Sequence, residues 1–138
     1  MSNEKRIILV EDDPDHADLI TDILEGEFKE GDIILVRDGQ EAIEYFQEFS
    51  VMCNGQAIKD IIKMIIIDLN LPKVSGMDVL KYLKKNSKYS PVPVIILSTS
   101  SDRETIDEAY KNGVNGFLTK PASYEEFITK LEDLKKYY

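Results

Sequence analysis

Residues 64–72 read Met-Ile-Ile-Ile-Asp-Leu-Asn-Leu-Pro, and the rest of the chain is organised around this stretch. Its four apolar residues lead directly into Asp68, and Pro72 follows four positions later. An isoleucine-rich run of this length is typical of a strand buried on both faces, as in a parallel sheet. Asp68 then lies where the strand ends, which in open α/β sheets is the edge where ligands bind. By position alone, Asp68 is either a structural cap or a functional carboxylate.

Four further apolar runs predict strands of the same kind, and helical patterns separate them. The runs are residues 7–10, 33–36, 94–97 and 116–119. Apolar residues recur at helical spacing within residues 14–28, 42–49, 76–86, 102–112 and 123–134. Strand and helix alternate five times with short connections. This alternation predicts an α/β fold with a doubly wound, five-stranded parallel sheet and helices on both of its faces.

Local signals predict where the helices begin and end. Asp13 followed by Pro14 is typical of an N-cap and a first helical residue. Gly26 predicts the end of that first helix, because glycine is common just beyond helix carboxyl ends. Residues 50–61 interrupt the alternation of elements, and we expect either a loop or an extension of the preceding helix.

Length, charge and cysteine content restrict the class of protein. The chain has 138 residues, and domains commonly contain roughly 100–200 residues, so we expect a single domain over residues 1–138. The formal net charge of −9 argues against a nucleic-acid partner, which needs clustered lysine and arginine. Cys53 is the single cysteine, which excludes a disulfide framework and a cysteine-based zinc site. The first apolar run is too short for a signal peptide or a membrane span, so we expect a cytoplasmic protein without a membrane partner.

Polar residues follow four of the five predicted strands, at the edge where the carboxyl ends of the strands meet. They are residues 11–13 (Glu-Asp-Asp), Asp68, Ser98 and Lys120. Clustered carboxylates repel one another unless a positive charge lies among them. A hard cation such as Mg²⁺ meets that need and prefers carboxylates, waters and phosphate oxygens. Phosphoryl transfer depends on this kind of charge neutralisation, and a carboxylate can itself be the nucleophile that forms an acyl phosphate.

In order and spacing, these motifs resemble the receiver domain of two-component response regulators over essentially the whole chain. The matching features are residues 11–13, residues 68–72 with Gly76, Ser98-Thr99 and Lys120-Pro121. The resemblance implies the flavodoxin-like receiver fold with strand order 2-1-3-4-5. It also implies a signalling domain, not an enzyme in the usual sense, which catalyses only its own phosphoryl transfer and slow dephosphorylation.

The resemblance assigns a role to each acidic residue of the site. Asp68 is the implied phosphoacceptor, which receives its phosphoryl group from a sensor histidine kinase. Asp12 would bind Mg²⁺ directly, and Glu11 would act largely through water. Asp68 itself and the backbone carbonyl of Asn70 would complete the protein ligands. Because Asp13 follows directly, the matching acidic pair could also be shifted by one residue.

The remaining roles fall on the last two strands. Ser98 matches the switch hydroxyl, although Thr99 would take this role if the fourth strand were one residue longer; the spacing to Lys120 favours Ser98. Lys120 would contact Asp68 or its phosphate, and a cis Lys120–Pro121 bond is expected. Phe117 matches the aromatic switch position of the family. Because phenylalanine lacks the hydroxyl of tyrosine, Phe117 would act by packing.

The resemblance also implies partners. Output would be docking to a downstream protein, or a homodimer, through the face of the fourth helix, fifth strand and fifth helix. The insertion at residues 50–61 resembles that of a subgroup of stand-alone receivers, which includes some that are paired with bacterial phytochromes.

Three other functions fit the sequence less well. A Mg²⁺-dependent phosphohydrolase usually has a second aspartate two residues after the first as its acid, but here that residue is Asn70. A flavodoxin binds phosphate with a hydroxyl- and glycine-rich loop, where this chain has the acidic residues 11–13. A degenerate receiver used as a scaffold would not need the acceptor, hydroxyl and lysine that this chain retains.

Overall fold

The computed structural model describes residues 5–27, 31–53, 55–99 and 102–119, together with residues 125, 129, 132 and 133. Its strands are β1 (Lys5–Val10), β2 (Gly31–Val36), β3 (Ile62–Asp68), β4 (Val94–Ser98) and β5 (Gly116–Thr119). The helices in this part of the chain are α1 (Pro14–Glu27), α2 (Gly39–Met52), the 3₁₀ helix η1 (Ile58–Asp60), α3 (Gly76–Lys85) and α4 (Arg103–Lys111). The predicted fifth helix lies largely outside the described residues.

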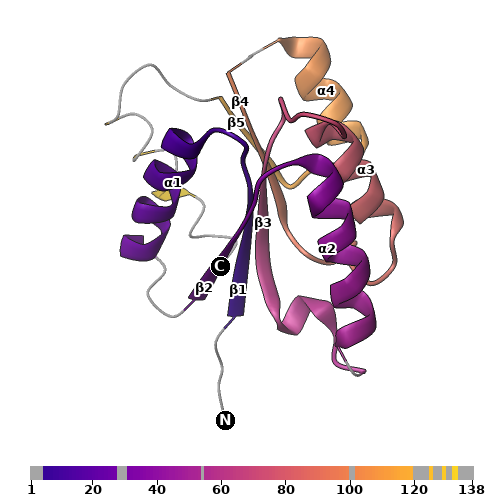
Figure 1. The fold of residues 1–138 in the computed structure, drawn as a ribbon. Helices are drawn as coiled ribbons and strands as arrows, with labels where there is room; N and C mark the ends of the chain where they lie inside the picture. Colours follow the sequence, from indigo (N-terminus) through magenta and orange to yellow (C-terminus); the bar gives the residue numbers. More distant parts are fainter. Residues whose placement is uncertain are drawn as a thin grey trace.

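The five strands form one parallel sheet in the order β2-β1-β3-β4-β5, which confirms the predicted fold and strand order. α1 covers one face of the sheet, whereas α2 and α3 cover the other, with α4 near the β4–β5 edge (Figure 1). Because all of the strands are parallel, their five carboxyl ends lie at one edge of the sheet, which we call the carboxyl edge. No helix in the described ranges is long and apolar enough to cross a membrane.

Two apolar layers hold the sheet between its helices. Successive side chains of a strand point to opposite faces, so Ile8 and Val10 join the cluster under α2 and α3, and Ile7 and Leu9 join the cluster under α1. β3 is buried along its length except for half-buried Lys63. Each fully buried isoleucine contributes roughly 1.5–3 kcal/mol. The central strand is thus buried on both faces, as the isoleucine-rich run predicted.

The predictions at the helix ends were partly correct. Asp13 caps α1, since its Oδ1 accepts the backbone N–H groups of Asp15 and His16 at 2.9 and 3.2 Å. Gly113 ends α4 with a φ of 92°, a conformation that glycine adopts easily. Gly26, however, does not end α1. The helix continues to Glu27, and Gly26 lacks the positive φ that terminates a helix at glycine.

Residues 50–61 combine both predicted alternatives. α2 extends through Met52, and a turn then leads into η1. Ile58 and Cys53 are buried in the cluster under α2 and α3, and the Cys53 thiol donates a hydrogen bond to the Phe49 carbonyl at 2.9 Å. The insertion is therefore anchored to the core through two side chains.

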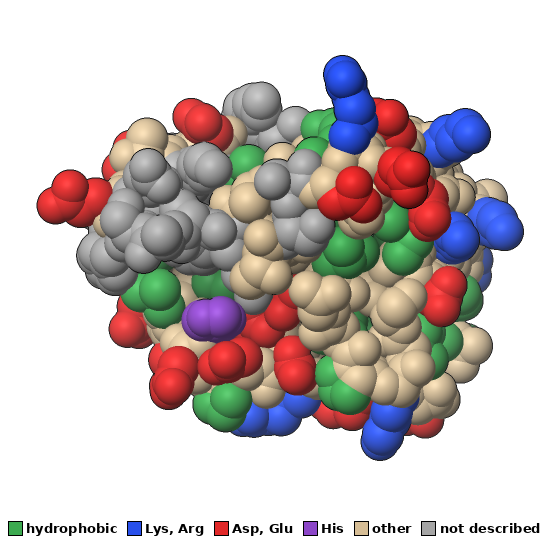
Figure 2. Space-filling view, turned by 90° about the horizontal axis from the view of Figure 1, so that it is seen from above, with side chains coloured by type: hydrophobic (Ala, Val, Ile, Leu, Met, Phe, Trp, Pro, Cys, Tyr) green, Lys and Arg blue, Asp and Glu red, His purple; other side chains and the backbone are tan. Residues whose placement is uncertain are grey.

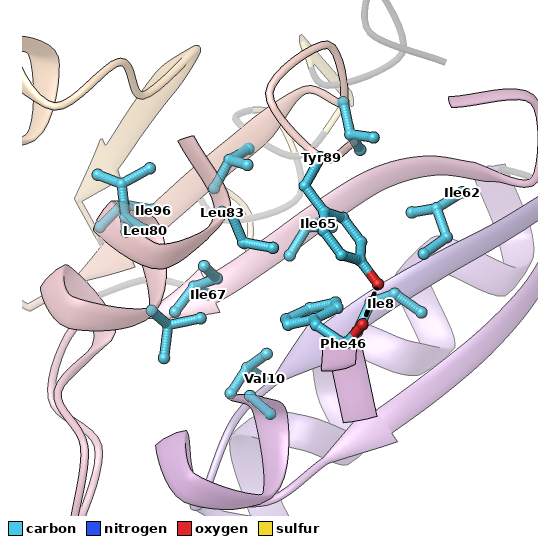
Figure 3. Packing of buried hydrophobic residues seen from close by; sticks show 14 of the residues in the cluster. Ile8, Val10, Phe46, Ile62, Ile65, Ile67, Leu80, Leu83, Tyr89 and Ile96 are labelled. Carbon is cyan, nitrogen blue, oxygen red and sulfur yellow. Dashed lines mark hydrogen bonds between the residues drawn. The ribbon is translucent and has the colours of Figure 1, made fainter. Parts of the chain in front are cut away.

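Tyr89, in the connection between α3 and β4, is a buried contact that the sequence patterns did not reveal. Its hydroxyl donates a hydrogen bond to the backbone carbonyl of Phe46 at 2.7 Å, and the two rings meet edge to face with their centroids 5.2 Å apart (Figure 3). Burial is the main cause that raises the pKa of the Tyr89 hydroxyl above its ordinary value. Tyr89 thus joins the α3–β4 connection to the middle of α2.

Replacing Tyr89 with phenylalanine should lower the free energy of unfolding by about 1 kcal/mol, because one buried hydrogen bond is lost while the ring packing is kept. Urea denaturation measures this difference. Tyr110→Phe is the matched control, since Tyr110 is 52% exposed, and exposed substitutions change stability by less than about 0.5 kcal/mol. Equal stability of the two variants would contradict a structural role for the Tyr89 hydroxyl.

Candidate functional site

The carboxyl edge of the sheet brings together side chains from three strands. Glu11 directly follows β1 and extends its pairing, since its N–H donates to the Val36 carbonyl at 2.9 Å. Asp68 ends β3 and Ser98 ends β4. Within the described ranges these three are the buried polar or charged side chains, with exposures of 1%, 6% and 0%. Burial of polar groups is unfavourable unless they are paired, so their concentration at one edge marks this edge as a functional site.

Three carboxylates of this edge form a compact group. Oxygen atoms of Glu11, Asp12 and Asp68 all lie within 4.8 Å of one another. Asp12 is exposed and opens the group to solvent, whereas the other two are buried. Figure 2, which views the molecule from above this edge, shows acidic side chains gathered beside the histidine. An all-oxygen, partly hydrated set of ligands fits Mg²⁺, which prefers one or two carboxylates and keeps several waters.

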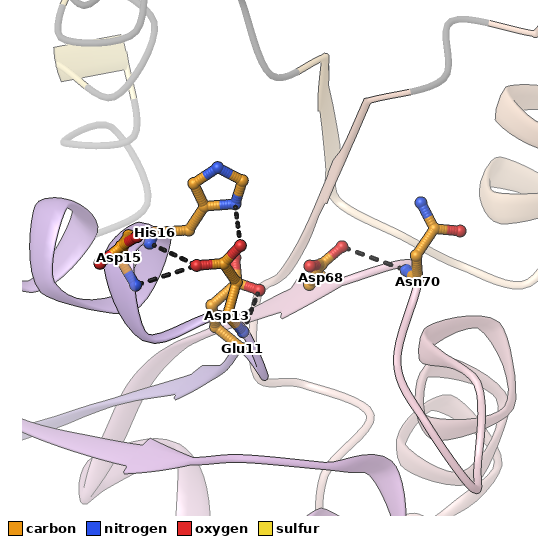
Figure 4. A network of polar contacts seen from close by, with 6 residues as sticks. All are labelled: Glu11, Asp13, Asp15, His16, Asp68 and Asn70. Carbon is orange, nitrogen blue, oxygen red and sulfur yellow. Dashed lines mark hydrogen bonds and ion pairs between the residues drawn. The ribbon is translucent and has the colours of Figure 1, made fainter.

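The side chain of Asp13 does not join this group and instead caps α1. Its two carboxylate oxygens face the start of α1, where Oδ1 forms the cap and Oδ2 lies 3.8 Å from His16 Nδ1. The backbone N–H of Asp13 donates to Glu11 Oε2 at 3.3 Å (Figure 4). The acidic pair beside Asp68 is therefore Glu11 and Asp12, while Asp13 orients Glu11 and begins the helix.

The end of β4 distinguishes the two candidate hydroxyls. Ser98 is the last residue of the strand and is fully buried, whereas Thr99 lies beyond it and is exposed. Ser98 pairs in register with Thr119, the last residue of β5. Phe117 is half-buried against the larger apolar cluster. Lys120, the Lys120–Pro121 bond and its predicted cis conformation lie outside the described residues.

The loop after β3 is held against Asp68 by short contacts. The N–H of Asn70 donates to Asp68 Oδ1 at 3.1 Å (Figure 4). Leu69 extends the sheet by donating to the Leu97 carbonyl at 2.9 Å, and Gly76 donates to the Leu69 carbonyl at 3.0 Å. A Cβ atom at Gly76 would lie 2.3 Å from the carbonyl oxygen of Asp68. Only glycine permits this close return of the chain at the start of α3.

The same loop is also fixed to the start of α2. A Cβ atom at Gly39 would lie 1.8 Å from the carbonyl oxygen of Val74. Beside this contact, Lys73 adopts a φ of 65°, and its Nζ lies 3.8 Å from Asp38 Oδ2. In the sequence, Asp38-Gly39 indicates only a turn. The contact depends on a segment far away in the chain, and the Asp-Gly pair was its only visible signal.

The sequence model of the response regulator receiver domain matches residues 7–132. The chain belongs to the receiver domain family of response regulators. The receiver is 36% identical over 132 residues to the probable methanogenesis regulatory protein FilR2 of Methanothrix harundinacea, an alignment that covers 96% of this chain and 82% of FilR2. It is 28% identical to the response regulator Rcp1 of Synechocystis, over 97% of this chain and 88% of Rcp1.

Solved structures agree with this assignment. The phosphorylated cyanobacterial phytochrome response regulator RcpA superposes with a TM-score of 0.84 at 30% identity, covering 98% of this chain and 94% of that chain. The Mn²⁺-bound form of Rcp1 gives a TM-score of 0.82 at 29% identity, covering 96% and 92%. Receiver domains are signalling domains of two-component systems that interact with histidine kinases and downstream targets. The family prediction made from residues 11–13, 68–72, 98–99 and 120–121 is confirmed.

The contact at Gly39 gives a test of how firmly the site loop is held. Gly39→Ala should lower the free energy of unfolding by about 1–3 kcal/mol, because the added methyl group overlaps the Val74 carbonyl. Gly26→Ala is the matched control, since a Cβ there meets nothing within 4 Å; within a helix it should raise stability by about 0.5–1 kcal/mol. Chemical denaturation measures both. A Gly39→Ala protein as stable as the wild type would show that the loop is not fixed to α2.

Proposed function

We propose that this receiver accepts a phosphoryl group on Asp68 and that the reaction depends on Mg²⁺. The main observation in support of this proposal is that carboxylate oxygens of Glu11, Asp12 and Asp68 lie within 4.8 Å of one another at the carboxyl edge of the central strands. Two of these side chains are buried. Their mutual repulsion favours a divalent cation at this point, and a cation there would also neutralise an incoming phosphoryl group.

In the proposed reaction, a carboxylate oxygen of Asp68 attacks the phosphorus of a phosphohistidine on the partner kinase. The P–O bond of an acyl phosphate forms as the P–N bond breaks, and the imidazole nitrogen keeps the electron pair of that bond. The metal ligands would be Asp12, Asp68 and the backbone carbonyl of Asn70, with Glu11 acting through water. Bound Mg²⁺ would supply charge neutralisation at the phosphoryl oxygens.

Ser98 and Lys120 are proposed to recognise the phosphoryl group. The buried Ser98 hydroxyl, at the end of β4, would donate a hydrogen bond to a phosphoryl oxygen. Lys120 directly follows Thr119, which pairs with Ser98 in the sheet, and its ammonium would pair with Asp68 before transfer and with the phosphate afterwards. Asn70 stands where a phosphohydrolase would carry its acid, which argues against sustained hydrolytic turnover.

The proposed role in the cell is a cytoplasmic switch formed by one receiver domain over residues 1–138. Its donor would be a sensor histidine kinase. Phosphorylation would alter the face of α4, β5 and the last helix, which would bind a downstream protein or a second copy of the chain. Tyr110 on α4 is exposed and supplies an apolar contact for that face. The net charge of −9 disfavours nucleic acid as a partner.

Among sensor histidine kinases, a phytochrome-type kinase is the proposed donor of the phosphoryl group. RcpA is described as a phytochrome response regulator, and the two chains align over 98% of this receiver at 30% identity. Residues 50–61 form an anchored insertion, which is the feature that suggested this subgroup.

Intact-mass spectrometry after incubation with acetyl phosphate and Mg²⁺ tests the acceptor. The wild type should gain about 80 Da, the mass of one phosphoryl group, and Asp68→Asn should gain nothing. Asp107→Asn, which changes an exposed carboxylate on α4, is the matched control and should be modified like the wild type. Chelation of the metal should prevent the gain in mass in both the wild type and Asp107→Asn. A wild type that stays unmodified where another receiver is labelled would overturn the proposal and favour a scaffold function.

A further inference from the structure

A hollow on the surface of this acidic protein is lined by four lysines. It has a volume of about 510 Å³ and lies where α3 and α4 end. Its cationic side chains are Lys81, Lys84 and Lys85 of α3 and Lys111 of α4, and its other described lining residues are uncharged. The chain has 26 acidic and 17 basic residues, so a hollow with four lysines and no described carboxylate stands out. We refer to it as the lysine hollow.

Lys84 fixes the shape of this hollow. Its Nζ donates to the backbone carbonyls of Ser90 and Val92 at 3.1 and 2.8 Å. A Cβ atom at Gly113 would lie 3.2 Å from the Lys84 side chain, so the end of α4 packs directly on it. Partial burial lowers the pKa of Lys84. An ammonium has three N–H donors, which leaves one of them for a ligand.

The other three lysines supply positive charge at the rim. Lys85 and Lys111 are exposed and Lys81 is half-buried. None of the three forms an ion pair with a carboxylate in the described part of the chain. Lysines near a helix carboxyl end also stabilise the helix dipole. That effect accounts for a lysine in the last turn of each helix, but it does not require the two helix ends to share a hollow whose described lining contains no carboxylate.

We propose that the lysine hollow binds an acidic segment of a partner protein through the carboxylates of that segment. Complementary charge is the main reason, because four lysines line the hollow and its described lining contains no carboxylate. Nucleic acids and anionic membranes fit less well. Their extended negative charge would meet a chain of net charge −9, whereas a short peptide keeps its contacts within the Debye length of about 8 Å at physiological salt.

The lysine hollow lies at the edge of the sheet opposite Asp68. Asn115 borders it and is joined to Val94 at the start of β4: the Asn115 N–H donates to the Val94 carbonyl, and Asn115 Oδ1 accepts the Val94 N–H, both at 2.9 Å. Ser98 lies at the other end of that strand. Five strand residues span about 16 Å at roughly 3.3 Å per residue. Binding at the hollow should therefore be independent of Asp68, and Asp68→Asn should bind the acidic segment as the wild type does.

Titration with a hexaglutamate peptide at low ionic strength tests the proposal. In ¹H–¹⁵N spectra, the amides of Asn112, Gly113 and Asn115 should show saturable shifts. Lys85→Gln with Lys111→Gln should raise the Kd about tenfold, because two ion pairs are lost. Lys59→Gln with Lys88→Gln removes two exposed lysines from elsewhere and should change the Kd by less than about twofold. Added salt should weaken binding to the wild type.

Several results would overturn the proposal. One is the absence of saturable shifts at Gly113, and another is an equal loss of affinity in the two double variants. A single-stranded oligonucleotide or an anionic vesicle that binds more tightly than the peptide through the same lysines would replace the protein partner with a polyanion. Shifts at Gly113 that depend on protein concentration without peptide would identify a second copy of the chain as the occupant. Because Asp68→Asn is assayed in parallel, failure here is distinguishable from failure of the phosphoacceptor assignment.

Discussion

The mutual repulsion of three carboxylates, held together at one edge of the sheet, is the constraint on which the proposed function depends. Parallel pairing of β1 with β3, in which Val10 lies opposite Ile67, places Glu11 and Asp68 side by side. Two like charges about 4 Å apart near a protein surface repel by roughly 4 kcal/mol. The buried isoleucines on both faces of the sheet keep the strands paired despite this repulsion. The packing energy of the core thus keeps the three carboxylates together, an arrangement that a bound cation would stabilise.

Much of the fold and of the site could be predicted because both follow from local signals. Buried parallel strands consist of apolar runs, and the residue after each run must lie at the carboxyl edge, so the placement of Glu11, Asp68 and Ser98 needed no tertiary information. Gly26 was predicted wrongly because glycine is tolerated inside a helix when other contacts continue it. The close contact of Gly39 with Val74 was missed because it joins segments that only the folded chain brings together.

The lysine hollow could not be predicted for the same reason. Along the sequence, Lys81, Lys84 and Lys85 look like the solvated side of one helix, and Lys111 looks like the end of another. Only the packing of α3 beside α4 brings them into one hollow. The folded receiver is consequently polarised, with clustered acidic groups at the carboxyl edge and clustered lysines at the amino edge. Under the two proposals, this separation would allow the two edges to bind different partners without direct competition.

Titration with Mn²⁺ is the most direct test of the proposed metal site, because this ion accepts the same oxygen ligands as Mg²⁺ and broadens the NMR signals of nearby nuclei. Substoichiometric Mn²⁺ should broaden the amide signals of Glu11, Asp12 and Asn70 first and leave that of Gly113 sharp. This selectivity should be lost in Asp12→Asn. Broadening that begins elsewhere, or that is unchanged in Asp12→Asn, would contradict a metal site formed by the three carboxylates.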